Sequence, residues 1–321
     1  MTVPLNVILS KVFTYSLVHD SIVCTIPILY ACLCAVISRQ ANIINIAAEG
    51  IIMFGAFFGF ATSYFTGSWI LGCLAGILIG VLVSWVMAAA YLKYNVNIFV
   101  AGLSINMIAT AGTRFLLNTV FHAQGNFVSP KVVPVPKVDF AFLDNSPVLK
   151  SLFSHYAVTE WLAFVVVAVI WFMLYKTVWG LRLRAVGQNE IAGLTAGINT
   201  KAKKMQALLL SGACAGLGGA HLSIGYSCLF IENMSGGRGF MGMAAMQFGN
   251  GNPLSAAIGC LLFGTSQSIA NRVAPWGVPN QLINMMPYIV TVLVLTITVV
   301  VQQAQERKMN SSLRQADSKK A

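Results

Sequence analysis

The chain has 321 residues, of which 57% are hydrophobic and 9% are charged, and its formal net charge is +11. A soluble globular protein carries roughly 25% charged residues because its surface must stay hydrated, so this composition excludes a water-facing fold and a disordered chain. Apolar runs of roughly 20 residues match the length that a helix needs to cross a hydrocarbon core about 30 Å thick. We therefore expect an all-α polytopic membrane protein.

The apolar runs predict about 8–10 transmembrane helices, some of them broken or re-entrant. In chain order, the candidate spans are residues 17–38, 50–66, 68–91, 98–120, 157–178, 205–229, 254–271 and 280–303. We expect residues 1–303 to form one transmembrane domain, with a cytoplasmic loop at 179–204, and residues 304–321 to form a basic cytoplasmic tail.

A ninth, shorter apolar segment covers residues 239–250 and is followed by the helix breakers of Gly251-Asn252-Pro253. A segment too short to span unaided predicts a broken or re-entrant helix. The stretch 40–50 is a similar polar interruption in the first half of the chain. Irregular backbone at membrane depth must be buried in protein or line a watery cavity. Paired interruptions indicate a transporter's binding region, and a plain structural kink is the alternative.

The basic residues lie mainly between and beyond the apolar runs. By the positive-inside rule, alternating spans then place the N-terminus outside and the C-terminus in the cytoplasm. This parity holds only if the short segment at 239–250 also crosses. The basic residues form no aromatic-interleaved face, so we expect contact with membrane lipid and no nucleic-acid partner.

The sequence lacks the residue clusters of an enzyme or a metal site. The histidines His19, His122, His155 and His221 are scattered. The seven cysteines contain no Cys-x-x-Cys pair and lie in apolar segments, as small buried side chains do. We expect no catalytic residues, no metal and no cofactor in this chain.

Small residues recur every fourth position at Gly72, Gly76 and Gly80, and again at Gly212 and Gly216. Such stripes let helix backbones approach closely in lipid. The pattern predicts close packing of these spans and says nothing of function.

Several polar side chains lie in or beside apolar spans and are candidates for a solute path. They are Asn42, Asn45, Glu49, Asn106, Gln247 and Asn250. A charge inside the membrane usually faces a cavity or a partner, so Glu49 is either a pathway or gating residue or a structural carboxylate that caps a helix start. The amides either bind solute or form interhelical hydrogen bonds. Arg114 is expected near the outer interface, where it snorkels.

The most informative stretch is the predicted cytoplasmic loop around residues 184–198, which has helical spacing at its centre and a small-residue face. It predicts a short helix parallel to the membrane that contacts a soluble partner; an ordinary positive-inside loop is the alternative. The candidate contact residues are Arg184, Gly187, Asn189, Glu190, Ala192, Gly193 and Gly197.

This loop resembles a motif in the permease subunits of bacterial ABC importers of the branched-chain amino acid, ribose and nucleoside group. The family's Arg-Ala-x-Gly-x-Asn-x-x-Ala-Ala-x-x-x-Gly-Ile motif is similar to Arg184, Ala185, Gly187, Asn189, Ala192, Gly197 and Ile198, with Gly193 in place of the second alanine. The segments 45–50 and 237–254 resemble the nucleoside or simple-sugar branch. The resemblance covers most of residues 40–300.

The resemblance implies a non-catalytic permease subunit in the bacterial cell membrane that works by alternating access. Its implied partners are a second, related permease subunit, two ATPase domains that hydrolyse ATP, and an extracytoplasmic solute-binding protein or lipoprotein. The loop at 184–198 would act as the coupling helix. Nucleosides are the expected solutes, with simple sugars next and branched-chain amino acids third. An autonomous ion-coupled carrier and a purely structural membrane protein are the rivals from other classes.

Overall fold

The computed structural model of the chain describes residues 16–138 and 155–274, together with positions 285, 289, 292, 293 and 296. Nearly all of the predicted span at 280–303, and the whole of the predicted tail at 304–321, therefore lie outside the described residues.

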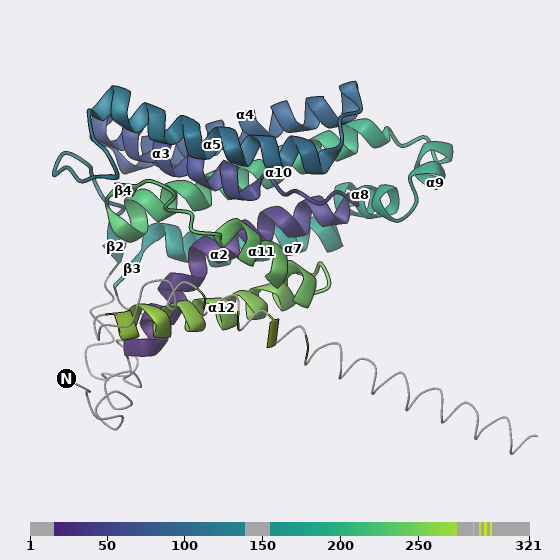
Figure 1. Cartoon of the computed structure of the whole chain (residues 1–321). Coiled ribbons are helices and arrows are strands. Elements are labelled where there is room, and N and C mark those ends of the chain that lie inside the picture. Colours follow the sequence, from purple (N-terminus) through teal and green to yellow (C-terminus); the bar gives the residue numbers. More distant parts are fainter. Residues whose placement is uncertain are drawn as a thin grey trace, which may run out of the picture.

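Seven helices of the described part are long and apolar enough to cross a membrane (Figure 1). They are α2 (Ser16–Gln40), α3 (Ala48–Thr66), α4 (Trp69–Tyr94), α5 (Ile98–Phe121), α7 (Val158–Lys176), α10 (Thr200–Ala220) continued by the π-helix η2 (His221–Ser227), and α12 (Pro253–Val273). They coincide with the first seven predicted spans, which confirms the all-α polytopic membrane fold.

The ends of these helices follow from local sequence. Side chains of Asn97, Asn199 and Asn252 accept main-chain N–H groups at the starts of α5, α10 and α12, as N-cap residues do. Helix α3 ends at Gly67, which has a φ of 65°, a conformation that glycine adopts without steric cost. Short segments of polar residues and glycine thus separate the apolar helices.

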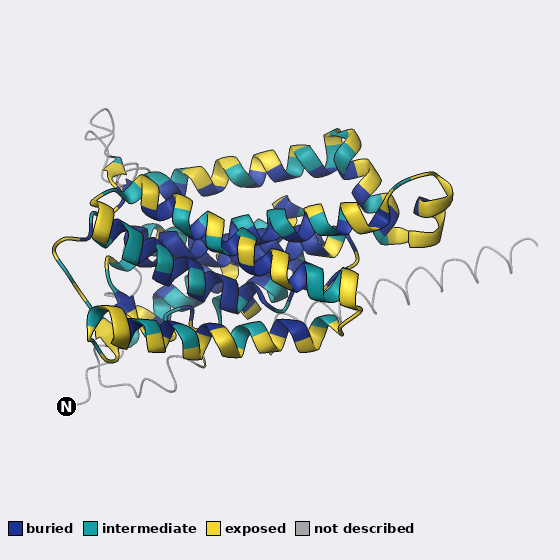
Figure 2. Cartoon of the chain, turned by 90° about the horizontal axis from the view of Figure 1, so that it is seen from above, coloured by how far each residue is buried: buried dark blue, intermediate teal, exposed yellow. Residues whose placement is uncertain are grey.

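Figure 2 shows the buried residues gathered in the middle of the bundle, and helix α2 supplies a long run of them, from Cys24 to Ser38. Of its most apolar stretch 89% is buried, against 22% for α5, whose outer face is exposed. α2 packs mainly against α10, α11 and α12. Lipid would cover the exposed apolar face of a helix such as α5. Helix α2 is instead covered by the other helices of the chain.

The glycine stripes of α4 and α10 face one another. A Cβ added at Gly216 would overlap the main-chain oxygen of Gly76, and one at Gly80 would overlap that of Gly212. The predicted close approach of these two backbones is confirmed. Six of the seven cysteines are buried and Cys228 is exposed.

The bundle has two distinct ends, which we call the α9 end and the far end (Figure 1). At the α9 end, α8 (Val178–Gln188) and the short α9 (Glu190–Thr195) connect α7 to α10. At the far end, β1 (Asn126–Phe127) pairs antiparallel with β4 (Phe230–Ile231), and β2 (Lys137–Val138) with β3 (Tyr156–Ala157). The hydropathy pattern of the sequence did not predict these two-residue strands.

One crossing is broken, as the sequence predicted. Helices α10 and α12 both begin at the α9 end, so the chain between them must return across the bundle (Figure 1). It does so through β4, the non-helical residues 232–237 and α11 (Arg238–Phe248). At about 1.5 Å per residue, the 11 residues of α11 extend about 16 Å, roughly half of a hydrocarbon core. Its start therefore lies deep in the bundle.

Candidate functional site

The carboxylate of Glu49 caps the start of the half-helix α11. The main-chain N–H of Gly237 donates to Oε1 at 2.7 Å, and the N–H of Gly239 donates to Oε2 at 2.7 Å. The first N–H groups of a helix lack intrahelical partners and carry partial positive charge. Glu49 lies in the first turn of α3. A side chain of one interrupted span therefore accepts the free N–H groups at the start of the other.

Glycine at position 239 makes this approach possible. A Cβ there would lie 2.6 Å from the main-chain nitrogen of Glu49 and 2.7 Å from its Cα. Real Cβ atoms do not come so close to backbone, so a side chain would push α11 away from α3.

A second cap of the same kind joins α5 to α3. The Oδ1 atom of Asn106 accepts the N–H of Gly50 at 2.8 Å, and its Nδ2 donates to the carbonyl of Ile46 at 3.0 Å. The amide thus satisfies groups on both sides of the α3 start. Asn106 and Glu49 together tie three helices at the depth where both interruptions meet.

An open groove of about 1380 Å³ runs along these caps on one side of the chain. Its polar lining comes from Glu49, Asn106, Thr110, Arg114, Asn118, Asn233 and Gln267, and its apolar lining includes Met107, Phe115, Phe240 and Met241. Arg114 pairs with Glu232, with 3.3 Å between Nε and Oε2. The groove therefore offers amides, a hydroxyl and aromatic rings, which suit a small polar solute with a flat ring.

The groove brings together two of the six predicted pathway residues, Glu49 and Asn106. Asn45 is 1% exposed, and its amide donates to Ser211 Oγ at 3.2 Å. Asn42 and Asn250 occupy left-handed turns, with φ of 57° and 49°, and Gln247 is exposed in the last turn of α11. These four are not among the described lining residues, and a role for them in the path stays a prediction.

Sequence reasoning missed a polar stripe on α5. Asn106, Thr110, Arg114 and Asn118 follow one another at intervals of four residues and all line the groove. Residues four apart share a helix face, so this spacing was a usable signal. Arg114 lines the groove and pairs with Glu232. The sequence had favoured an arginine that only snorkels at the outer interface.

The predicted loop helix is α9, which protrudes beyond the ends of the long helices (Figure 1). The side chain of Asn189 accepts the N–H of Ala192 at 3.1 Å and so caps its start, and Gly197, with a φ of 76°, follows its end. The side chains of Ile191 and Leu194 are 75% and 56% exposed. An exposed apolar face on a protruding helix is typical of a docking surface.

An ion pair fixes α9 to α10. The Nζ atom of Lys204 lies 2.5 Å from Oε2 of Glu190, and this hydrogen bond lowers the pKa of the Glu190 carboxyl below its usual value. The buried Gly193 faces Val186 of α8 and Thr200 of α10. The loop is therefore an ordered unit.

The remaining predicted contact residues hold α8 in place. A Cβ at Gly187 would overlap the main-chain oxygen of Gln40 at the end of α2. The guanidinium of Arg184 lies 4.8 Å from the centre of the Tyr175 ring, a cation–π distance. The structure thus gives Gly187 and Arg184 internal contacts, and their contact with a partner stays a prediction.

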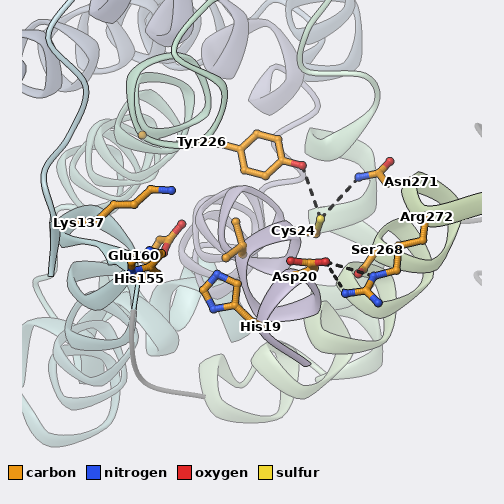
Figure 3. A pocket seen from close by; sticks show the side chains of 12 residues that line it. His19, Asp20, Cys24, Lys137, His155, Glu160, Tyr226, Ser268, Asn271 and Arg272 are labelled. Atoms are coloured by element: carbon orange, nitrogen blue, oxygen red, sulfur yellow. Dashed lines mark hydrogen bonds and ion pairs between the residues drawn. The ribbon is translucent and has the colours of Figure 1, made fainter. Parts of the chain in front are cut away.

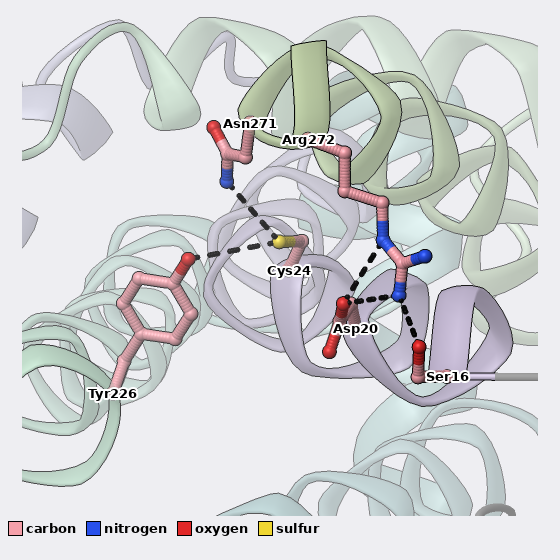
Figure 4. A network of polar contacts seen from close by, with 6 residues as sticks. All are labelled: Ser16, Asp20, Cys24, Tyr226, Asn271 and Arg272. Atoms are coloured by element: carbon pink, nitrogen blue, oxygen red, sulfur yellow. Dashed lines mark hydrogen bonds and ion pairs between the residues drawn. The ribbon is translucent and has the colours of Figure 1, made fainter. Parts of the chain in front are cut away.

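A second, smaller cavity of about 410 Å³ lies at the far end (Figure 3). Arg272 of α12 donates to Asp20 of α2 at 2.6 Å and to Ser16 at 2.7 Å, and Cys24 contacts Tyr226 and Asn271 (Figure 4). This network joins the start of α2 to the end of α12. It braces the far end of the bundle.

Residues 18–295 match the family described as the permease component of the branched-chain amino acid transport system. No solved structure matches the chain.

Three curated relatives cover most of the chain. The nucleoside ABC transporter permease protein NupC of Lactococcus lactis subsp. cremoris is 35% identical over 88% of this chain and 91% of its own length. The guanosine ABC transporter permease protein NupQ of Bacillus subtilis is 32% identical over 87% of this chain and 91% of its own. A putative glucose ABC transporter permease of Haloferax volcanii is 28% identical over 95% and 98%.

Proposed function

Because the chain belongs to the family of permease components of branched-chain amino acid transport systems, we propose that it is the membrane-spanning subunit of an ATP-driven importer for nucleosides. Permease subunits contribute the solute path, and ATP is hydrolysed on partner chains. The importer would lie in the bacterial cell membrane, with the α9 end in the cytoplasm, since Arg39, Lys93 and the basic residues 176–204 gather there.

The observation that carries this proposal is the meeting of two interrupted spans at Glu49, beside an open groove. Interrupted helices that meet near mid-membrane form the binding region in many transporters. The hydrogen-bonding groups of the groove suit ribose hydroxyls and base edges, and Phe115 and Phe240 suit a flat base. Two relatives named for nucleoside or guanosine transport support the same solute class.

The groove is open along one side, so we expect a second permease subunit to close it. The sequence resemblance favours a related but different chain as this partner. The solute would then pass between two grooves that face one another. The cavity at the far end lies on the side from which an extracytoplasmic solute-binding protein would deliver the solute.

Movement of the ATPases would reach the path through α9. Its exposed Ile191 and Leu194 offer an apolar face to an ATPase surface, and the Glu190–Lys204 pair joins this helix to α10. Closure of the ATPases on ATP would shift α8, α9 and the ends of α2 and α10 together. The groove would thereby open alternately to the two sides of the membrane.

A sugar is the second candidate solute, because one relative is named as a putative glucose permease. The two are separated by reconstituting the complete importer in proteoliposomes and measuring uptake of labelled guanosine and labelled glucose. We expect ATP-dependent uptake of guanosine that excess unlabelled guanosine abolishes and excess glucose leaves unchanged. Uptake of glucose alone would replace the nucleoside assignment with a sugar.

A further inference from the structure

The end of α2 contacts both the predicted coupling loop and the half-helix segment. The last helical residue of α2 is Gln40. Its main-chain oxygen faces Gly187 of α8 so closely that no Cβ fits at position 187. Its side-chain Nε2 donates to the main-chain oxygen of Gly251 at 2.7 Å. Gly251 lies in the turn between α11 and α12 and has a φ of 74°.

Helix α2 is also packed tightly along α11 and α12. A Cβ at Gly242 of α11 would lie 2.6 Å from the Ala31 side chain, and one at Gly264 of α12 would overlap Thr25. Protein interiors this dense transmit displacements instead of absorbing them. A shift of the end of α2 would therefore reach α11 at two places, at the turn that follows it through Gly251 and within the helix through Gly242.

We infer that Gln40 is a positioning residue for transport, through which displacement of α8 and α9 reaches the half-helix that Glu49 caps. This inference rests on the proposed function. Among the described residues, Gln40 is not one of those that line the groove, and its side chain donates to Gly251. Its role is to keep the α11–α12 turn attached to the element that the coupling loop displaces.

The test uses the complete importer in proteoliposomes and records guanosine uptake and ATP hydrolysis in the same samples. For Gln40→Ala we expect uptake per ATP to fall about fivefold, the factor that the loss of one neutral hydrogen bond corresponds to, with the rate of ATP hydrolysis within about twofold of wild type. Gln40→Glu has the same size but cannot donate to a carbonyl, and we expect the same loss. Gln40→Lys retains a donor and should restore at least half of the wild-type ratio.

Gln206→Ala is the matched control, because Gln206 is also a hydrogen-bonded glutamine at the α9 end, where it accepts from Trp179 at 2.9 Å and from Lys203 at 3.2 Å. It should leave the ratio unchanged. An unchanged ratio in both Gln40→Ala and Gln40→Glu would overturn the inference, and so would failure of both variants to assemble, since Gln40 would then serve folding only. If the wild-type importer itself shows no solute-stimulated ATP hydrolysis, the proposed function fails instead.

Discussion

The carboxylate of Glu49 lies 2.7 Å from the main-chain nitrogen of Gly239, although 190 residues separate the two in sequence. Each belongs to an interrupted span, and each interruption leaves backbone groups that the membrane cannot hydrate. The contact removes this cost for the start of α11 while keeping the site open to the groove. A charged residue that holds a broken helix beside a cavity can release that helix when the surrounding helices move.

Replacing Glu49 should impair transport more than assembly. Glu49→Ala removes two charge-assisted hydrogen bonds, each worth about 1.5–3 kcal/mol, and about 1.4 kcal/mol corresponds to a factor of ten. We expect ATP-dependent guanosine uptake to fall at least tenfold, with a smaller loss for Glu49→Gln, which keeps one acceptor. Co-purification with the partner subunits measures assembly.

Glu232→Gln is the control for Glu49. Its ion-pair partner Arg114 is 74% exposed, and ion pairs with such exposed groups contribute little; glutamine also keeps an oxygen that can accept the N–H of Gly125. Its uptake should stay within about twofold of wild type. Normal kinetics in Glu49→Ala would show that the cap is dispensable for transport.

Alanine at position 239 should destabilise the chain even though alanine favours helices. The gain in helix propensity is about 1 kcal/mol, whereas overpacking costs about 1–3 kcal/mol, and a Cβ at Gly239 meets backbone of Glu49. We expect a lower unfolding temperature in detergent and reduced uptake. Gly112→Ala, where the nearest atom to a Cβ lies at 3.8 Å, gains helix propensity without overlap, so its unfolding temperature should be equal to or above that of wild type and its uptake normal. Equal behaviour of the two variants would contradict the packing argument.

Charges on the exposed face of α9 should uncouple transport. Ile191→Asp and Leu194→Asp alter side chains that are 75% and 56% exposed, so the fold should tolerate them. We expect solute-stimulated ATP hydrolysis to fall at least tenfold, because a charge would be buried in the proposed docking surface. Val128→Asp changes a 63%-exposed side chain at the far end and should leave stimulation intact. A similar loss in all three would point to general instability.

The Glu190–Lys204 pair should make the order of α9 dependent on pH. Lys204 lowers the folded-state pKa of Glu190 from its ordinary value of 4.5. The stabilisation is therefore fully present above about pH 4.5 and is lost as the pH falls through the lowered folded-state pKa. Hydrogen exchange of the α9 amides, compared between wild type and Glu190→Gln at each pH, measures this. Protection should be greater in wild type at pH 7, and the difference should shrink below pH 4.5; a constant difference would contradict the assignment.

Local sequence was sufficient to predict the long spans, the broken segment and the short loop helix. These features depend on the length of apolar runs and on helix-breaking residues such as Gly251-Asn252-Pro253, whose effect on the backbone is local. The glycine repeat at Gly72, Gly76 and Gly80 likewise predicted a close approach, because small residues permit it whatever the partner helix is.

The partners of the polar residues could not be predicted in this way. Glu49 was expected to cap a helix start or to face a path, and it caps the start of a helix from the other half of the chain while lining a groove. Asn45 and Asn106 are both asparagines beside apolar runs, yet one is buried against Ser211 and the other lines the groove. Hydropathy cannot separate them, because the difference lies in which helices pack together.

The central claim, that this chain moves solute only as the permease part of an ATP-driven importer, is tested most directly by reconstitution. Labelled guanosine uptake is measured in proteoliposomes that contain either the purified chain alone or the chain with its second permease, ATPases and solute-binding protein. We expect uptake only in the complete system and only with hydrolysable ATP. Uptake by the chain alone, driven by a sodium or proton gradient, would contradict the account and identify an autonomous ion-coupled carrier.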